Sequence, residues 1–394
     1  MLASHPQALA LKMPRYLTAK AAEHAAHIEW ARRKLAEFRE MDLPHRVLLD
    51  RLDAQLADDA QRLRVIERAL SEPAMLPLTE KACFILNANL RDLSEHYIAG
   101  LLQQGKEELR WRQLLLKTAH RIGLTWIEDI LVRLDRDLSI IPARHRDHSI
   151  PVFFAPPNQH LSVLSLPGIF HEFGHCVVSK HREIVYGLEE TVAEYFESER
   201  HKLGPMLPAQ RAKRLQQIAN AASYWNEHRL VEIFCDVFAS YTCGAVNVLS
   251  MVDLSRANTM DPYAVDCDYP PHATRIIVSY LALSAVQQQG IGVSEVWNDW
   301  QRMAARLTVT NEFKAFCPDA LVSSLAIRSV ELIAQHQPAT PRQNILPAAP
   351  DQALLTAGAE DLCDAATSGL TVIWHTPHFY DRWMAGFHAM LGFN

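Results

Sequence analysis

The sequence predicts a mainly helical protein of the α+β class, with a small sheet between a helical N-terminal lobe and further helices. Three observations support this prediction. Apolar residues recur every three or four positions from Thr18 to about Leu138, which is the period of a helix. Prolines and short apolar runs replace that pattern between Ile141 and His160. Helical patterns then return and continue over most of the remaining chain.

The N-terminal lobe is predicted to span residues 1–145. Its helical pattern is interrupted near Pro44, in the proline-containing segment 71–77, and near Gly105 and Gly123. Since proline and glycine interrupt helices, we expect four or five helices in this lobe. The charged positions between the apolar ones are typical of solvated helix faces.

Two further parts are predicted after the lobe, over residues 146–305 and 306–394. Short apolar runs at 150–155 and 161–164 are typical of strands, and the first is the stronger candidate. A strand edge of this kind could hold an extended peptide by main-chain hydrogen bonds. A proline-rich linker is expected over 337–350. Helices are expected at about 188–203, 208–222, 225–248, 271–289, 293–305, 311–336 and 351–367.

Composition excludes several classes of protein. The 394 residues carry a net charge of −6 with basic residues scattered along the chain, so a nucleic-acid partner is not expected. No apolar stretch is long enough to span a membrane, and the start lacks the pattern of a secretion signal. The seven cysteines lack the Cys-x-x-Cys spacing and indicate reduced thiols. We therefore expect a soluble, cytoplasmic protein whose oligomeric state the sequence does not set.

The most informative segment contains His171, Glu172 and His175 in the spacing His-Glu-x-x-His. Positions i and i+4 lie on one helix face, so both imidazoles can bind one cation. Glu172 lies about 100° round the helix from His171, where it can take a proton from a water on that cation. The pattern predicts a zinc site with Glu172 as general base. The alternative is a core helix with hydrogen-bonded histidines.

A third ligand is expected from a second apolar helix, in which Glu232 and Asp236 are again four residues apart. Carboxylates are seldom buried without a cation or a hydrogen-bond donor. Glu232 as the ligand, with Asp236 accepting the free N–H of a ligating histidine, would satisfy both groups. The alternative is the solvent-facing edge of an ordinary helix.

Two cysteines adjoin the proposed ligands. Cys176 follows His175, and Cys235 precedes Asp236. Each lies about 100° round its helix from the neighbouring ligand, and this direction argues against a thiol as metal ligand.

These two helices resemble the gluzincin metallopeptidases, the HExxH enzymes whose third ligand is the Glu of a downstream ExxxD helix. The segment 232–239 (Glu-Ile-Phe-Cys-Asp-Val-Phe-Ala) is similar to the ExxADxxA segment of the M48 peptidase family. The segment 269–275 (Tyr-Pro-Pro-His-Ala-Thr-Arg) is similar to the HPPxxxR segment of that family, with Tyr269 in the place of His. The resemblance covers residues 161–280, and the flanking regions resemble no family. It implies a zincin-like metallopeptidase core, bound Zn²⁺ and a peptide or protein substrate.

A rival third ligand is offered by Glu189, Glu190 and Glu194, which follow the motif at the shorter spacing of thermolysin-like gluzincins. Neither Glu190 nor Glu194 is followed four residues later by an aspartate that could support the site. We therefore prefer Glu232, and we interpret residues 189–199 as a charged helix near the cleft.

The oxyanion of the reaction needs a hydrogen-bond donor besides the metal. Four side chains are candidates: His272 and Arg275, which we also count as catalytic, and the weaker candidates His228 and Tyr269. Arg275 could instead pair with a helix carboxylate, and Tyr269 could be a packed turn residue.

Three other functions compete with a general peptidase. A di-iron bundle needs a second Glu-x-x-His pair, which the chain lacks. A zincin-fold regulatory or binding protein would act through protein contact, and loss of Glu172 would be its mark. A peptidase restricted to one partner protein cannot be distinguished by sequence from a general one.

Overall fold

The computed structural model is mainly helical with a small sheet of three short strands, which confirms the coarse fold class. The chain divides into two units. Unit 1 comprises Met1–Lys106 and Glu128–Arg133, and unit 2 comprises Glu107–Ile127 and Leu134–Asn394. The division into residues 1–145, 146–305 and 306–394 stays a prediction. The structure describes residues 6–41, 43–134, 139–141, 150–155, 164–204, 207–257, 261–265, 268–286, 293–336, 362 and 365.

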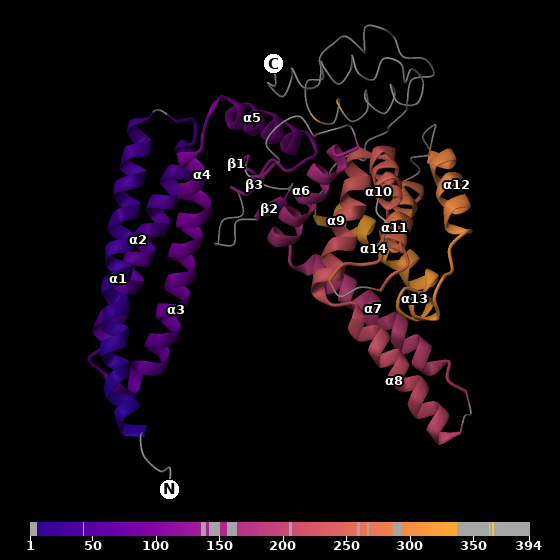
Figure 1. The fold of residues 1–394 in the computed structure, drawn as a ribbon, viewed down its shortest axis with the longest axis horizontal. Helices are drawn as coiled ribbons and strands as arrows, with labels where there is room; N and C mark the ends of the chain where they lie inside the picture. The colour runs from indigo at the N-terminus through magenta and orange to yellow at the C-terminus, as the bar shows by residue number, and fades with distance from the viewer. Residues whose placement is uncertain are drawn as a thin grey trace. The chain divides into compact units, whose positions relative to one another are not determined.

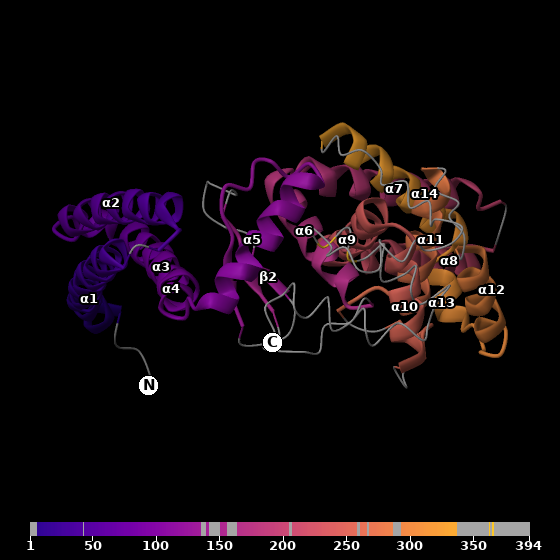
Figure 2. The same ribbon diagram turned by 90° about the horizontal axis from the view of Figure 1, so that it is seen from above.

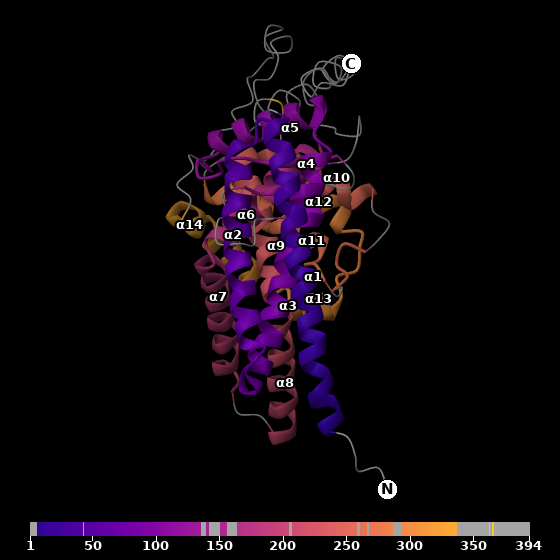
Figure 3. The same cartoon turned by 90° about the vertical axis from the view of Figure 1, so that its left-hand side faces the viewer.

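Unit 1 consists mainly of three long helices that run side by side in Figures 1 and 3. Its elements are α1 (Pro6–Glu40), α2 (Arg46–Ala69), the 3-10 turn η1 (Pro73–Met75), α3 (Leu76–Asp92), the π-helical η2 (Leu93–Ile98), α4 (Ala99–Leu102) and strand β1 (Leu131–Arg133).

The core of unit 1 follows from the spacing of its leucines. Leu49, Leu52, Leu56 and Leu63 are buried on α2, three, four and seven residues apart, so they form one apolar stripe that packs on α1 and α3. His45, which is fully buried before α2, lies 3.0 Å through Nδ1 from Oδ2 of Asp129. This pair satisfies two polar groups that would otherwise destabilise the fold.

Unit 2 is built around α9, which packs against α6, α7, α10, α11 and α14 and lies among these helices in Figures 1 and 2. Its helices are α5 (Lys106–Arg121), α6 (Leu166–Lys180), α7 (Glu183–His201), α8 (Pro208–Tyr224), α9 (Glu227–Cys243), α10 (Ala245–Ala257), α11 (His272–Ala285), α12 (Val293–Ala304), α13 (Asn311–Phe316) and α14 (Asp319–His336).

The strands of unit 2 are β2 (Ser139–Ile141) and β3 (Val152–Phe154), which pair antiparallel. Ile140 lies opposite Phe153 in this register. All three residues of β3 are buried, which agrees with the prediction of a strand over 150–155. The second predicted strand, at 161–164, falls almost wholly outside the described residues.

Three predictions about elements are wrong in detail. The helical pattern predicted up to Leu138 contains β1, because Ile130, Leu131 and Val132 form a continuous buried apolar run after α5 has ended. The helix predicted over 225–248 is two helices, since Gly244 adopts a φ of 74°, which favours glycine. The helix predicted over 311–336 is divided before Asp319 by Pro318, into α13 and α14.

The other helices predicted between 188 and 305 are confirmed as α7, α8, α11 and α12. The predicted linker 337–350 and almost all of the predicted helix 351–367 lie outside the described residues. Among the described residues, no helix combines the length and the apolar character that crossing a membrane requires.

Candidate metal centre

His171, Glu172 and His175 lie on α6, as the motif predicts. Pro167 occupies the first turn of this helix, where its lack of an N–H costs nothing. Ser165 stands at the N-cap position, but its side chain makes no capping hydrogen bond. Ile169, Phe170, Phe173, Val177 and Val178 are buried and fix the orientation of α6, so that His171 and His175 share one face.

Glu232 and Asp236 lie on α9, which begins where the side chain of Asn226 accepts a hydrogen bond from the backbone N–H of Arg229. The exposed fraction is 4% for Glu232 and 0% for Asp236. The alternative that these two carboxylates face solvent is therefore wrong. Two buried acids on one helix require cationic partners close by.

The close approach of α6 and α9 depends on Gly174. A Cβ at this position would lie 2.9 Å from Cα of Cys235 and 3.0 Å from its Sγ. Any larger residue would push the two helices apart, because the nearest atom belongs to the backbone of α9. Gly174 thus allows the histidines of one helix to reach the carboxylate of the other.

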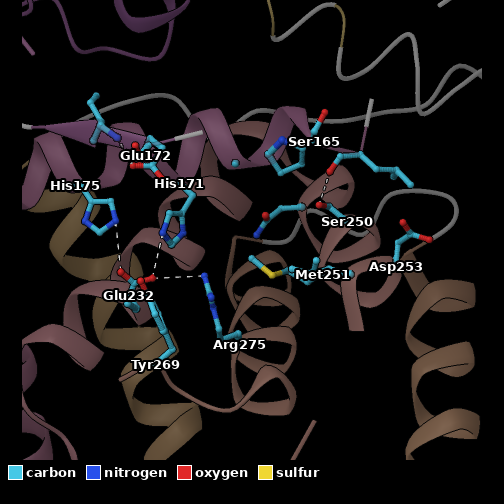
Figure 4. A pocket seen from close by; sticks show the side chains of 17 residues that line it. Ser165, His171, Glu172, His175, Glu232, Ser250, Met251, Asp253, Tyr269 and Arg275 are labelled. Carbon is cyan, nitrogen blue, oxygen red and sulfur yellow. Dashed lines mark hydrogen bonds and ion pairs between the residues drawn. The ribbon is translucent and has the colours of Figure 1, made fainter. Parts of the chain in front are cut away.

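The two oxygens of Glu232 each face one imidazole (Figure 4). Oε2 lies 3.3 Å from Nε2 of His171, and Oε1 lies 3.6 Å from Nε2 of His175. Ligands about 2.0–2.2 Å from a tetrahedral zinc ion are separated by about 3.3–3.6 Å. Each oxygen of Glu232 therefore lies from its imidazole at the separation expected between two ligands of one zinc ion.

Asp236 contacts the ring nitrogen of His171 that does not face Glu232. Its Oδ1 lies 2.9 Å from Nδ1 of His171, which leaves Nε2 to face Glu232. Asp236 also accepts two hydrogen bonds from Arg275, from Nε at 2.6 Å and from Nη2 at 2.8 Å. Carboxylate support of this kind fixes the orientation of a ligating histidine.

The electrostatics of the cluster favour a positive charge on His171 and a neutral ring on His175. Burial lowers the pKa of His171, but hydrogen bonds to Asp236 and Glu232 more than offset this effect and raise it to about 9. Burial raises the pKa of Asp236, but the charge and hydrogen bonds of Arg275 outweigh burial and lower it to about 2. Burial lowers the pKa of His175 to about 4, which leaves a neutral ring able to donate its lone pair to a metal.

Glu172 is anchored by strand β2. Its Oε2 accepts a hydrogen bond of 2.9 Å from the backbone N–H of Ile140. Burial raises the pKa of Glu172 to about 7, against the charge of His171 and the hydrogen bond from Ile140. A carboxyl group with this pKa can both accept and release a proton near neutral pH.

A cavity of 830 Å³ opens beside the cluster and is lined by His171, Glu172, His175 and Glu232. Strand β2 contributes Ser139 and Ile140 to its wall. The sequence did not predict the contribution from α10, because the predicted helix ended at 248 and most of α10 was assigned to no element. The lining residues from α10 are Asn247, Ser250, Met251, Asp253 and Leu254.

Of the four predicted oxyanion donors, two line the cavity. Tyr269 and Arg275 line the cavity, whereas His272 is not among its lining residues. Arg275 is paired with Asp236, so the alternative weighed for it, a helix carboxylate partner, is confirmed. His228 is not among the lining residues either, but its Nδ1 lies 4.0 Å from Oε1 of Glu232 and its ring is edge-on to Tyr269 at a centroid distance of 5.2 Å.

The rival acids are not part of the cluster. Glu189, Glu190 and Glu194 are exposed on α7, and none of them lines the cavity. The predicted charged helix over 189–199 is present within α7.

Cys235 is closer to the histidines than its helix direction suggested. Its Sγ forms a group with nitrogens of His171 and His175 in which all ligand atoms lie within 4.8 Å of one another. Among the described residues, the group at this place whose ligand atoms are close enough together to hold a metal ion is thus His171, His175 and Cys235, and it does not include Glu232. Burial and the charge of Glu232 raise the pKa of the Cys235 thiol well above its usual value, which disfavours the thiolate that binds metals. Glu232 as the third ligand stays a prediction.

Comparisons with protein-family models, with curated proteins and with solved structures gave no match to this chain.

Proposed function

We propose that the chain is a zinc-dependent peptidase, with His171, His175 and Glu232 as ligands of the ion. The observation that carries this proposal is the placement of both Glu232 oxygens within 3.3 and 3.6 Å of the two imidazoles. The donor set of two imidazoles and one carboxylate suits zinc among the common divalent ions. Three protein ligands are also the number that catalytic zinc sites use.

The chemistry divides between the ion and the residues around it. When bound, zinc supplies Lewis acidity to the carbonyl of the scissile bond and to water. Glu172 takes a proton from the attacking water through its carboxylate and returns it to the leaving nitrogen as the carbon–nitrogen bond breaks. The hydrogen bond from Ile140 holds this carboxylate in position. Asp236 keeps the Nδ1 proton on His171, which keeps Nε2 directed at Glu232.

A peptide substrate is favoured by strand β2. Among the strands that the structure describes, β2 is terminal in the sheet, and Ser139 and Ile140 line the cavity beside the cluster. An edge strand can hold an extended peptide by main-chain hydrogen bonds. A regulatory or binding protein would have no use for a carboxyl group held as Glu172 is held.

Arg275 acts in this proposal as a positioning residue. Both of its short hydrogen bonds go to Asp236, and its Nη2 lies 3.6 Å from Oε2 of Glu232. Its charge offsets the two buried carboxylates. Tyr269, which lines the cavity, and His228 beside it stay candidates for the oxyanion donor.

The decisive test is the substitution Glu172→Gln in zinc-loaded protein. Cleavage of a peptide library, followed by mass spectrometry, should fall by about 100- to 10,000-fold because the general base is lost, while bound zinc measured by elemental analysis stays unchanged. Glu232→Ala should lose both zinc and cleavage. Glu194→Gln, an exposed acid of α7, is the control and should retain both.

Two outcomes would overturn the proposal. One is turnover by Glu172→Gln at the rate of the unaltered protein. The other is a zinc-loaded, folded protein that cleaves no member of the library and is indifferent to a chelator.

A further inference from the structure

A second group of histidines and a carboxylate lies where three helices of unit 2 end or begin. His181 is the residue directly after α6, Glu183 is the first residue of α7, and His336 is the last residue of α14. His336 is far from the other two in sequence, so only the packing of α14 against α7 brings it there.

The two imidazoles converge on one oxygen atom. Nδ1 of His181 and Nδ1 of His336 each lie 3.5 Å from Oε1 of Glu183. The ring centroids are 5.5 Å apart, and all three ligand atoms lie within 4.8 Å of one another. At 3.5 Å both contacts are long for hydrogen bonds. They match the separation of about 3.3–3.6 Å between ligands of a tetrahedral ion.

The neighbouring positive charges are directed elsewhere. Lys180 places its Nζ 4.2 Å from the ring centroid of Trp126. Arg182 donates from Nη2 to Oε1 of Glu227 at 2.6 Å. An ordinary surface ion pair looks different, as His201 shows: it contacts Glu197 one turn away on the same helix, at 3.3 Å, with no second imidazole.

We propose that His181, Glu183 and His336 form a second metal site, which binds a divalent transition-metal ion of the zinc, nickel or copper type. Two imidazole nitrogens and one carboxylate oxygen select these ions over magnesium and calcium. The site is partly open, since the side chain of Glu183 is 55% exposed, and water completes the coordination. The bound ion ties the end of α6 to α7 and α14.

The site is independent of the proposed peptidase activity, although α6 precedes His181 and carries the other cluster. Its test is therefore a count of bound ions and needs no substrate. Metal-free full-length protein is titrated with zinc chloride by calorimetry, and the bound zinc is counted by elemental analysis after dialysis.

The expected result is two zinc ions for the unaltered protein and one for His336→Ala. Glu183→Gln should weaken zinc binding at the second site by at least about 10-fold. Removal of a residue that only orients a ligand already weakens binding by about this factor, and removal of a ligand should weaken it no less. His201→Ala is the matched control, a surface histidine beside a glutamate, and should retain both ions. In a His175→Ala background, zinc should still raise the melting temperature, and the added His336→Ala substitution should remove that rise.

The proposal is overturned if the unaltered protein and His336→Ala bind the same number of zinc ions with the same affinity. Circular dichroism establishes that each variant is folded, and Glu183→Gln, which keeps the size of the side chain, repeats the test without removing a ring. If instead the buried cluster binds no zinc, the unaltered protein should bind a single ion, which His336→Ala loses and His175→Ala keeps. The two proposals can therefore fail separately.

Discussion

The buried cluster at Glu232 and the surface cluster at Glu183 both place two imidazoles around one glutamate, but they differ in what stands behind the ligands. At the buried cluster, Asp236 holds His171, and Arg275 holds Asp236 through two short hydrogen bonds. At the surface cluster, Glu183 is more than half exposed. Solvent therefore surrounds much of the Glu183 side chain, whereas Glu232 is enclosed by other side chains.

The two clusters also differ in the free energy that the folded state needs to maintain them. Burying the carboxylates of Glu232 and Asp236 costs on the order of several kcal/mol of hydration free energy. Their interactions with Arg275 and the imidazoles must offset this cost. Such a cost is typical of a site whose geometry must not change during a reaction. The surface cluster costs little to maintain, so it can gain or lose an ion without loss of the fold.

The largest expected effect is on stability, for Asp236→Ala. The guanidinium of Arg275 loses both of its short hydrogen bonds in a largely buried position and keeps only the longer contact with Glu232, so the metal-free protein should lose about 3–5 kcal/mol of unfolding free energy. Glu183→Ala, at the exposed cluster, should cost no more than about 1 kcal/mol. Urea denaturation of both variants measures this. Equal losses would remove the distinction between a supported and an unsupported cluster.

The next effect concerns zinc affinity. Glu232→Gln should weaken zinc binding at the buried cluster by more than about 100-fold, which exceeds the roughly 10- to 100-fold loss typical of groups that only orient a ligand. Glu183→Gln should weaken the surface cluster much less, because water can replace its oxygen. Competition with a fluorescent zinc chelator gives both affinities. A smaller loss for Glu232→Gln than for Glu183→Gln would reverse the ranking of the two sites.

A smaller effect is expected from the contact between α6 and α9. Gly174→Ala should destabilise the protein by about 1–3 kcal/mol, because the new methyl group meets the backbone of Cys235 and overpacks the contact. The matched control is Gly187→Ala on α7, where the methyl group would meet the side chain of Leu332 at 3.2 Å. Thermal unfolding compares the two. A harmless Gly174→Ala would mean that the close approach is not needed.

The smallest effect is expected for Cys235→Ala. If Glu232 is the third ligand, zinc affinity at the buried cluster should change by less than about threefold, below the loss seen when support of a ligand is removed. Zinc competition measures this too. A loss as large as that of Glu232→Gln would identify the Cys235 sulfur as the third ligand and would correct our assignment.

Much of the buried cluster was predictable because each half of it is local. The spacing of His171 and His175 fixes their shared face, and the same spacing pairs Glu232 with Asp236 on α9. The apolar neighbours of both pairs indicate burial, which the structure confirms for α6 and α9. The mainly helical class was predictable for the same reason, since a helical period is read within a few residues.

Other parts of the site depend on contacts that no local pattern encodes. The N–H of Ile140 reaches Glu172 from a strand that the sequence interpretation assigned to no element. The wall from α10 was missed because the predicted helix ended at 248, so most of α10 was assigned to no element. Cys235 was set aside by its direction on one helix, whereas its distance to the histidines depends on how closely two helices pack.

The sequence by itself determined the chemistry that is available: imidazoles, carboxylates and their order around each helix axis. Only the tertiary structure decided which of them meet, because helix periodicity sets directions within one element and leaves the distance between elements to packing. Gly174 sets that distance between α6 and α9, and the packing of α14 on α7 sets it for His336. A metal site is a property of such distances, to within a few tenths of an ångström, and so it is specified only when the helices have packed.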